Sequence, residues 1–154
     1  LLFILFFSYA VAKEGKLNFD SGKGDWLAYI ANSDDNTVSA VNLTTNTIEA
    51  VISVRSFPSF IAITADGTKA YVTNQEDNTV TPINLTNHPP TSGNAISVGN
   101  APFAIAITPD GSKAYVTNIG DLVNPSTVSV IRLADNTVIA SIPVGIAPLG
   151  IAIT

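Results

Sequence analysis

Carboxylates are the side chains of this sequence whose type and spacing could do chemistry. Five of the twelve acidic residues form three groups, Asp34 with Asp35, Glu76 with Asp77, and Asp121, at intervals of 42 and 44 residues. If a regular fold brought the groups to one face, they could attract a divalent cation or a cationic ligand. None of these segments has the alternating Asp/Asn spacing of a dedicated calcium loop. We therefore predict solvated loops and no metal site, and keep the five acids as weak candidates for a cation-attracting face.

The other reactive side chains do not form a catalytic set. His88 is the only histidine, and we interpret it as a loop residue because imidazole ligands normally come in sets. The chain has no cysteine, which excludes a thiolate nucleophile and a cysteine-ligated metal. Asp66 and Asp110 occupy equivalent turns, and such repetition indicates a structural role. No Ser/His/Asp set or Gly-rich phosphate loop is visible, so we predict no catalytic residue and no cofactor.

An internal repeat explains the even spacing. Residues 57–74 and 101–118 match at 13 of 18 positions, 44 residues apart, and residues 147–154 begin a further copy. A period of this length is typical of propeller blades or helical arrays. The runs are short, alternate between apolar and polar residues and are broken by Asp-Gly and Asn-Thr, which favours strands. The two Asn-Leu-Thr sequons, possible glycosylation sites at Asn42 and Asn84, also follow from the repetition.

Each repeat divides into four strands, which we call A to D. In the second repeat they are predicted at 60–64, 69–74, 79–85 and 95–98, with Asp66-Gly67 as a two-residue hairpin turn between A and B. Because the strands are antiparallel, B–C loops and D–A connectors emerge on one face, and A–B turns and C–D loops on the other. All five candidate acids lie in B–C loops. The repeated tyrosines of strand B are predicted to pack between blades, with their hydroxyls near the edge.

Several of these segments together resemble one known family. The pentapeptide Ala-Tyr-Val-Thr-Asn occurs at residues 70–74 and 114–118, flanked by motifs such as Asp77-Asn78-Thr79-Val80 and Ile142-Pro143-Val144-Gly145. Over residues 27–154 the chain resembles the YVTN family of β-propeller repeats. The resemblance implies an all-β propeller of four-stranded antiparallel blades, mostly seven in the family, found in archaeal and bacterial surface-layer and secreted proteins. Relatives in the wider group include lactonase-like enzymes and subunits of periplasmic redox proteins.

The sequence departs from the repeat at three points. Ala31 stands where the pentapeptide usually has Thr, the second C–D connection (residues 87–94) is two residues longer, and the third B–C loop (residues 119–126) is longer as well. Loops on a regular scaffold are where specificity tends to lie. They are also where insertions accumulate at little thermodynamic cost, so we favour neutral drift as the explanation for both loops and keep specificity as the alternative.

The first residues suggest export. Residues 1–7 are wholly apolar, and Ala10-Val11-Ala12 fits a cleavage site, so we predict that residues 1–12 are the end of a signal peptide. The apolar run is too short to span a membrane. Residues 13–27 are then a lead-in, and the repeats occupy 28–69, 70–113 and 114–154. Three blades are part of a ring, so we expect a truncated chain, without an initiating Met, whose open ends expose two apolar blade faces.

Composition narrows the function to two classes. Seven basic against twelve acidic residues give no electrostatic footprint for nucleic acid. The leading hypothesis is an exported, non-catalytic propeller, secreted, periplasmic or on the cell surface, that serves as a structural, adhesion or ligand-binding scaffold. Its partners would be a protein, glycan or small molecule, besides further blades of the same chain. The alternative is an exported enzyme or periplasmic redox-enzyme subunit with its site at the channel mouth.

Overall fold

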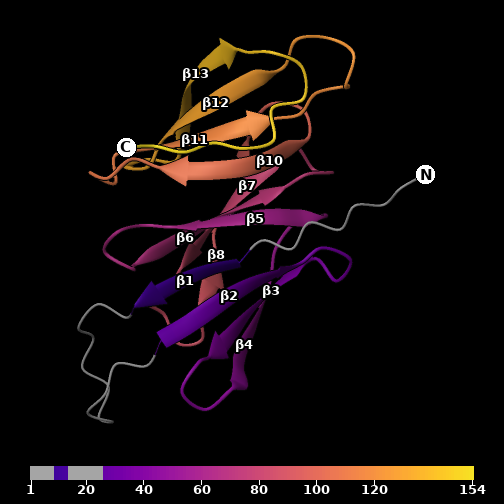
Figure 1. The fold of residues 1–154 in the computed structure, drawn as a ribbon. Helices are drawn as coiled ribbons and strands as arrows, with labels where there is room; N and C mark the ends of the chain where they lie inside the picture. The colour runs from indigo at the N-terminus through magenta and orange to yellow at the C-terminus, as the bar shows by residue number, and fades with distance from the viewer. Residues whose placement is uncertain (1–8, 14–25) are drawn as a thin grey trace.

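The computed structural model describes residues 9–13 and 26–154, and in these residues it is all-β, with strands joined by turns and loops. The strands form three antiparallel sheets that lie one above the other without closing into a ring (Figure 1). We call the sheets blades 1, 2 and 3 in chain order. The predicted all-β fold of antiparallel sheets is confirmed; two of the sheets have four strands and the middle one has five. The apolar run at residues 1–7 and most of the lead-in lie outside the described residues.

Blade 1 combines a strand from before the repeats with three strands of the first repeat. Its strands pair in chain order, A to D: β1 (Tyr9–Lys13), β2 (Trp26–Asn32), β3 (Thr37–Asn42) and β4 (Thr47–Ser53). In β1, Tyr9 lies opposite Ile30 and Lys13 opposite Trp26. Strand A of this blade therefore comes from the segment that contains the predicted cleavage site, and cleavage after Ala12 would remove most of it.

Blade 2 shows the complete repeat. Its strands are β5 (Pro58–Ile63), β6 (Lys69–Asn74), β7 (Thr79–Asn84), β8 (Thr91–Ser92) and β9 (Ile96–Ser97). Strand D is broken into β8 and β9, which pair with opposite ends of β7. The break follows the long C–D connection, which adds residues before strand D can align with its neighbour. The predicted single strand at 95–98 thus covers only the second half of strand D.

Blade 3 has an unbroken strand D. Its strands are β10 (Pro102–Ile107), β11 (Lys113–Asn118), β12 (Thr127–Arg132) and β13 (Thr137–Pro143). A register shift between Val130 and Ile131 where β12 meets β13 repeats the shift between Ala40 and Val41 in blade 1. The segment after β13 contains Ile151-Ala152-Ile153, which matches the end of β5 and of β10, but forms no strand.

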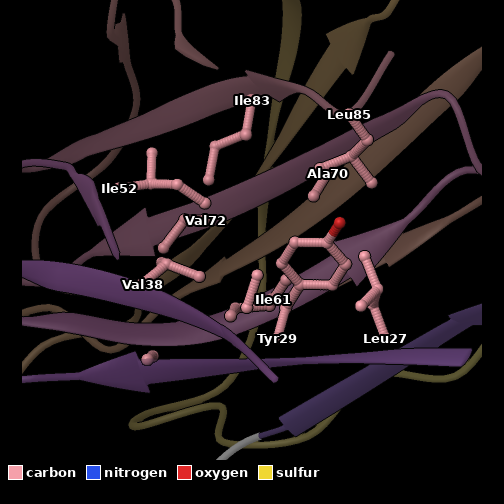
Figure 2. Close-up of a cluster of buried hydrophobic side chains, with 11 residues drawn as sticks. Leu27, Tyr29, Val38, Ile52, Ile61, Ala70, Val72, Ile83 and Leu85 are labelled. Carbon is pink, nitrogen blue, oxygen red and sulfur yellow. The ribbon is translucent and has the colours of Figure 1, made fainter. Parts of the chain in front are cut away.

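Two apolar clusters hold the blades together, because strand alternation gives every blade two apolar faces and neighbouring blades bury the faces that they turn toward each other. The cluster between blades 1 and 2 is shown in Figure 2 and contains Leu27, Tyr29, Val38, Ile52, Ile61, Ala70, Val72, Ile83 and Leu85 among others. The cluster between blades 2 and 3 contains Tyr71, Val80, Ile96, Ile105, Ala114, Val116, Ile131 and Leu133. Tyr71 is fully buried, and its hydroxyl donates to Asn136 Oδ1 at 3.1 Å at the edge of blade 3. The predicted packing of the strand B tyrosine between blades is confirmed here.

The A–B turn is wider than the predicted two-residue hairpin, so that prediction was wrong. Thr64 N–H donates to the Lys69 carbonyl at 3.0 Å, which leaves four residues in the turn. Only Gly67 of the Asp-Gly pair has positive φ, at 70°. Asp66 instead accepts hydrogen bonds from the hydroxyl of Thr64 (2.6 Å) and from the backbone N–H of Thr68 (3.0 Å). Its carboxylate closes the turn, which fits the structural role expected of a repeated residue.

Candidate functional site

The B–C loops and the D–A connectors share one face of the molecule, as predicted, and we call it the B–C face. Backbone hydrogen bonds tie each loop to a connector. Gln75 N–H donates to the Phe57 carbonyl and Ile119 N–H to the Ala101 carbonyl, both at 2.9 Å. Ser126 N–H donates to the Gly145 carbonyl at 3.3 Å. The face is therefore a set of braced loops, and it collects the candidate acids.

A polar residue at the end of each B–C loop fixes the connector beside it. Each of these side chains accepts a hydrogen bond from the backbone N–H of the residue that precedes the connector proline: Asn36 from Phe57 (2.9 Å), Asn78 from Ala101 (2.8 Å) and Ser126 from Ala147 (3.3 Å). The three donor residues have φ of 56°, 51° and 51°, a conformation that residues other than glycine rarely adopt. The side-chain bond supports that conformation, so these polar residues serve the fold.

The asparagine that ends the pentapeptide ties strand B to strand C. Its Nδ2 donates to two hydroxyls on strand C in every blade: Asn32 to Thr37 and Ser39, Asn74 to Thr79 and Thr81, Asn118 to Thr127 and Ser129, at 2.8–3.0 Å. The Oδ1 atoms of Asn74 and Asn118 are buried and accept no hydrogen bond from the described residues. Asn74 and Asn118 are 0% and 1% exposed, so neither amide reaches a ligand at the surface.

The threonine that precedes the asparagine in the pentapeptide forms a hydrogen bond between neighbouring blades. Thr73 is fully buried, and its hydroxyl donates to the carbonyl of Phe103 in blade 3 at 2.7 Å. The same oxygen accepts a hydrogen bond from Phe60 N–H at 3.0 Å within blade 2. In blade 1 the equivalent residue is Ala31, which has no hydroxyl group to donate such a hydrogen bond. Ser33 provides a nearby substitute, because its hydroxyl donates to the Pro58 carbonyl of blade 2 at 2.8 Å.

The five candidate acids, Asp34, Asp35, Glu76, Asp77 and Asp121, are all exposed on the B–C face. Asp77 accepts a hydrogen bond from Ser56 N–H at 3.0 Å. Asp121 accepts from the N–H groups of Asn124 (2.9 Å) and Val123 (3.0 Å), and these bonds, with one from the Asn124 side chain, lower the pKa of Asp121 to about 2. Among the described residues, no three His, Cys, Asp or Glu side chains lie close enough together to hold a metal ion.

The opposite face carries the A–B turns and the C–D loops. Asp110 repeats the turn of Asp66, and hydrogen bonds from the Thr108 hydroxyl, the Ser112 N–H and the Ser112 hydroxyl lower the pKa of Asp110 to about 2. His88 lies exposed in the long C–D loop of blade 2, as interpreted from the sequence, and is joined to Pro89 by a cis peptide bond.

The two sequons have different surroundings. Asn42 is buried, donates to the Glu49 carboxylate and accepts from the N–H groups of Thr44 and Thr45. Asn84 is exposed and accepts from Thr86 N–H at 2.9 Å. Asn84 also borders a shallow cavity of about 190 Å³, whose other lining residues are Lys69, Pro82, Ile83, Thr91, Ser92, Gly93 and Asn136.

One feature of the B–C face was not predicted from the sequence, namely the ordered tip of the loop at residues 119–126. Leu122 and Val123 are 65% and 73% exposed. On one side of the tip, the Asp121 carboxylate accepts hydrogen bonds from Val123 and Asn124. On the other side, the buried Ser126 hydroxyl donates to the Ile119 carbonyl at 2.6 Å. The extra length of this loop was visible in the sequence. Its two apolar residues, Leu122 and Val123, could not be distinguished in the sequence from residues of a strand.

Comparison with known proteins supports the fold. No protein-family model and no curated protein matches the chain. Among solved structures, Kuenenia stuttgartiensis hydrazine synthase is similar with 28% identity over 79% of this chain and a TM-score of 0.73. A functionally unknown protein from Desulfotomaculum acetoxidans DSM 771 is similar with 24% identity over 77% of this chain and a TM-score of 0.64. Dihydro-heme d1 dehydrogenase NirN is similar with 14% identity over 91% of this chain and a TM-score of 0.71.

The fold is β-propeller-like. Hydrazine synthase and NirN both contain propellers, and this chain aligns with 34% and 28% of their lengths. It spans 39% of the Desulfotomaculum protein. The two matches below 25% identity bear on the fold alone. Within the described residues there is no helix that is long and apolar enough to cross a membrane.

Proposed function

We propose that this protein is an exported, non-catalytic β-propeller of the YVTN type that binds a partner at the cell surface or in the extracellular space. In this proposal the three blades belong to a larger ring, mostly seven-bladed in that family. The apolar run at residues 1–7 supports export. The repeated pentapeptide supports the family. Its Thr bonds to the neighbouring blade and its Asn bonds to the next strand of the same blade, so both side chains serve the fold.

The observation that carries the binding function is the loop at residues 119–126. It is longer than the corresponding loops, is held at Asp121 and Ser126, and presents Leu122 and Val123 to solvent. A braced loop that displays apolar side chains can bind without a large loss of conformational entropy. Apolar contact area of this kind suits a protein surface or the apolar face of a sugar ring, and the exposed carboxylate of Asp121 in the same loop favours a partner that is not strongly anionic.

A binding assay on isolated cell envelopes of the source organism tests this function. The purified 154-residue chain should sediment with the envelopes in a saturable manner. The double variant Leu122→Ser/Val123→Ser should bind at least tenfold more weakly. Val138→Ser/Ile139→Ser is the matched control, because these residues are 41% and 43% exposed on the outer strand β13. Non-saturable binding, or equal loss in both variants, would refute a recognition role for the loop.

The alternative, an exported enzyme or periplasmic redox-enzyme subunit of the lactonase-like or dehydrogenase-associated kind, is favoured by one observation. The similarity to hydrazine synthase, at 28% identity, extends over 79% of this chain. A purified chain that carries a visible absorbance band from a bound redox cofactor, or that hydrolyses lactones, would favour this alternative over the scaffold. The scaffold proposal expects neither property.

A further inference from the structure

The two Asn-Leu-Thr sequons occupy the same position in successive blades. Asn42 is the last residue of β3 and Asn84 is the last residue of β7, so each precedes a C–D connection. An Asn-X-Thr or Asn-X-Ser sequence in which X is not proline is the acceptor signal for N-linked glycosylation. Asn124-Pro125-Ser126 has proline in the middle and does not qualify. Because the two sequons have the same sequence and position, their surroundings can be compared directly.

The short C–D turn of blade 1 encloses Asn42. The turn closes where Thr47 pairs with Asn42. Within it, Asn42 Oδ1 accepts hydrogen bonds from the N–H groups of Thr44 (2.8 Å) and Thr45 (3.1 Å). The Nδ2 of Asn42 donates to the Glu49 carboxylate, and the residue is only 3% exposed. The nitrogen that would have to form a bond to a sugar is therefore both hydrogen-bonded and covered.

The longer C–D connection of blade 2 leaves Asn84 uncovered. Thr91 pairs with Asn84 as Thr47 pairs with Asn42, but with two more residues in between. Asn84 Oδ1 accepts hydrogen bonds from the N–H and the hydroxyl of Thr86, at 2.9 and 2.7 Å. Asn84 is exposed, and its Nδ2 donates to no residue in the part of the chain that the structure describes. The insertion in the second repeat thus leaves this amide nitrogen open to reaction.

Open space borders Asn84 as well. The shallow cavity of about 190 Å³ is lined by Asn84 together with Pro82 and Thr91 of blade 2 and Asn136 of blade 3, among others. The hydroxyl of Thr91 and the amide of Asn136 can form hydrogen bonds with the hydroxyl groups of a sugar. A first sugar ring on Asn84 therefore has room and polar partners at the border of two blades, and no core side chain has to move.

We propose that Asn84, and not Asn42, is the acceptor of an N-linked glycan. In the transfer, Asn84 Nδ2 forms a bond to the anomeric carbon of a sugar carried on a lipid diphosphate. The bond from that carbon to the diphosphate oxygen breaks, the lipid diphosphate leaves with the electron pair, and Nδ2 gives up one proton to a base of the transferase. Use of the site in the cell rests on the export proposed above, since such sequons are modified in secreted proteins.

Glycosylation of the folded 154-residue chain in vitro tests the proposal. The purified chain is incubated with an oligosaccharyltransferase that accepts any Asn-X-Thr sequence and with its lipid-linked oligosaccharide, and glycopeptides are measured by mass spectrometry. Conditions are set so that two synthetic peptides, residues 38–48 and 80–90, are both modified without the fold. The folded chain should carry one glycan, at Asn84, with at least tenfold less at Asn42.

A matched pair of variants removes one sequon at a time. Thr86→Ala and Thr44→Ala each replace the threonine of a sequon at an exposed position and keep the asparagine. Thr86→Ala should lower glycosylation of the folded chain at least tenfold, whereas Thr44→Ala should leave it unchanged. Thr86→Ser retains a sequon and should be glycosylated at Asn84.

Two results would overturn the proposal. The first is modification of Asn42 in the folded chain to the same extent as Asn84. The second is an unmodified Asn84 in the folded chain under conditions in which the peptide 80–90 is modified. Because the purified reaction does not depend on export, the two proposals can fail separately. A chain that is glycosylated at Asn84 in vitro but stays inside the cell would refute export and support the acceptor.

Discussion

Replacement of Thr73 by valine tests whether the repeat's threonine joins one blade to the next. The side chain is fully buried, donates to the Phe103 carbonyl of blade 3 at 2.7 Å and accepts from Phe60 N–H at 3.0 Å. Valine has nearly the same shape and leaves no cavity, so the change removes the hydrogen bonds of the hydroxyl, including a longer one of 3.4 Å to the Phe60 carbonyl, without altering the packing. Loss of a buried partner costs about 1–3 kcal/mol for each group left behind. With two such groups, we expect Thr73→Val to lower the free energy of unfolding by about 2–6 kcal/mol.

Urea denaturation followed by circular dichroism measures this effect. With an m-value of about 2 kcal/mol/M, the urea concentration at the midpoint should fall by about 1–3 M. Thr86→Val is the matched control, because Thr86 is exposed and bonds only within its own turn to Asn84; its effect should stay within about 0.5 kcal/mol. Thr73→Ser keeps the hydroxyl and should recover most of the loss. A cost below about 0.5 kcal/mol for Thr73→Val would refute the inter-blade role, since a lost buried hydrogen bond exceeds that value.

Two further predictions concern the connectors and the turns. Gly99→Ala should destabilise the protein by about 1–3 kcal/mol, the usual cost of overpacking, because a Cβ there would lie 2.4 Å from Asn118 Nδ2. Gly145→Ala meets no atom within 4 Å and should be neutral in the same denaturation assay; equal effects would refute the steric argument. The pKa of Asp110 is about 2, below its ordinary value of 3.8, so its carboxylate stabilises the fold above pH 4, and this contribution is lost as the pH falls from 4 toward 2. Thermal melts of Asp110→Asn between pH 2 and 6 should show a smaller dependence on pH than the wild type, and an unchanged slope would contradict this assignment.

The repeat explains why most of the fold could be predicted from the sequence. Strand B of blade 2 was predicted at the residues that form β6, and the B–C face was predicted from strand direction alone. Local exceptions could not be predicted. The break between β8 and β9 depends on how the long C–D connection meets β7, and the width of the A–B turn depends on the hydrogen bonds of Asp66. The long connection was visible in the sequence, but its effect on the pairing of strand D with β7 was not. The hydrogen bonds of Asp66 are local, and the Asp-Gly pair alone did not indicate that they would widen the turn.

The roles of the polar residues were harder to predict than the strands. Asn78 and Ala101 are 23 residues apart, and Thr73 and Phe103 are 30 apart, so their hydrogen bonds become apparent only once the blades are stacked. The acids were recognised by their type and spacing, but the sequence does not show that Asp121 closes its own loop. The apolar tip of that loop was also missed, because Leu122 and Val123 are residue types that usually signal a buried strand.

Amide hydrogen exchange at Ala101, measured by NMR, tests the central claim most directly, namely that the repeat's polar side chains hold the blades rather than a ligand. Ala101 N–H donates to Asn78 Oδ1 at 2.8 Å in a connector outside the strand ladders. It should exchange as slowly as the amides of β10, and Asn78→Ala should speed its exchange at least tenfold while the amides of β2 keep their protection. Rapid exchange of Ala101 in the wild type, or no change in the variant, would contradict the claim.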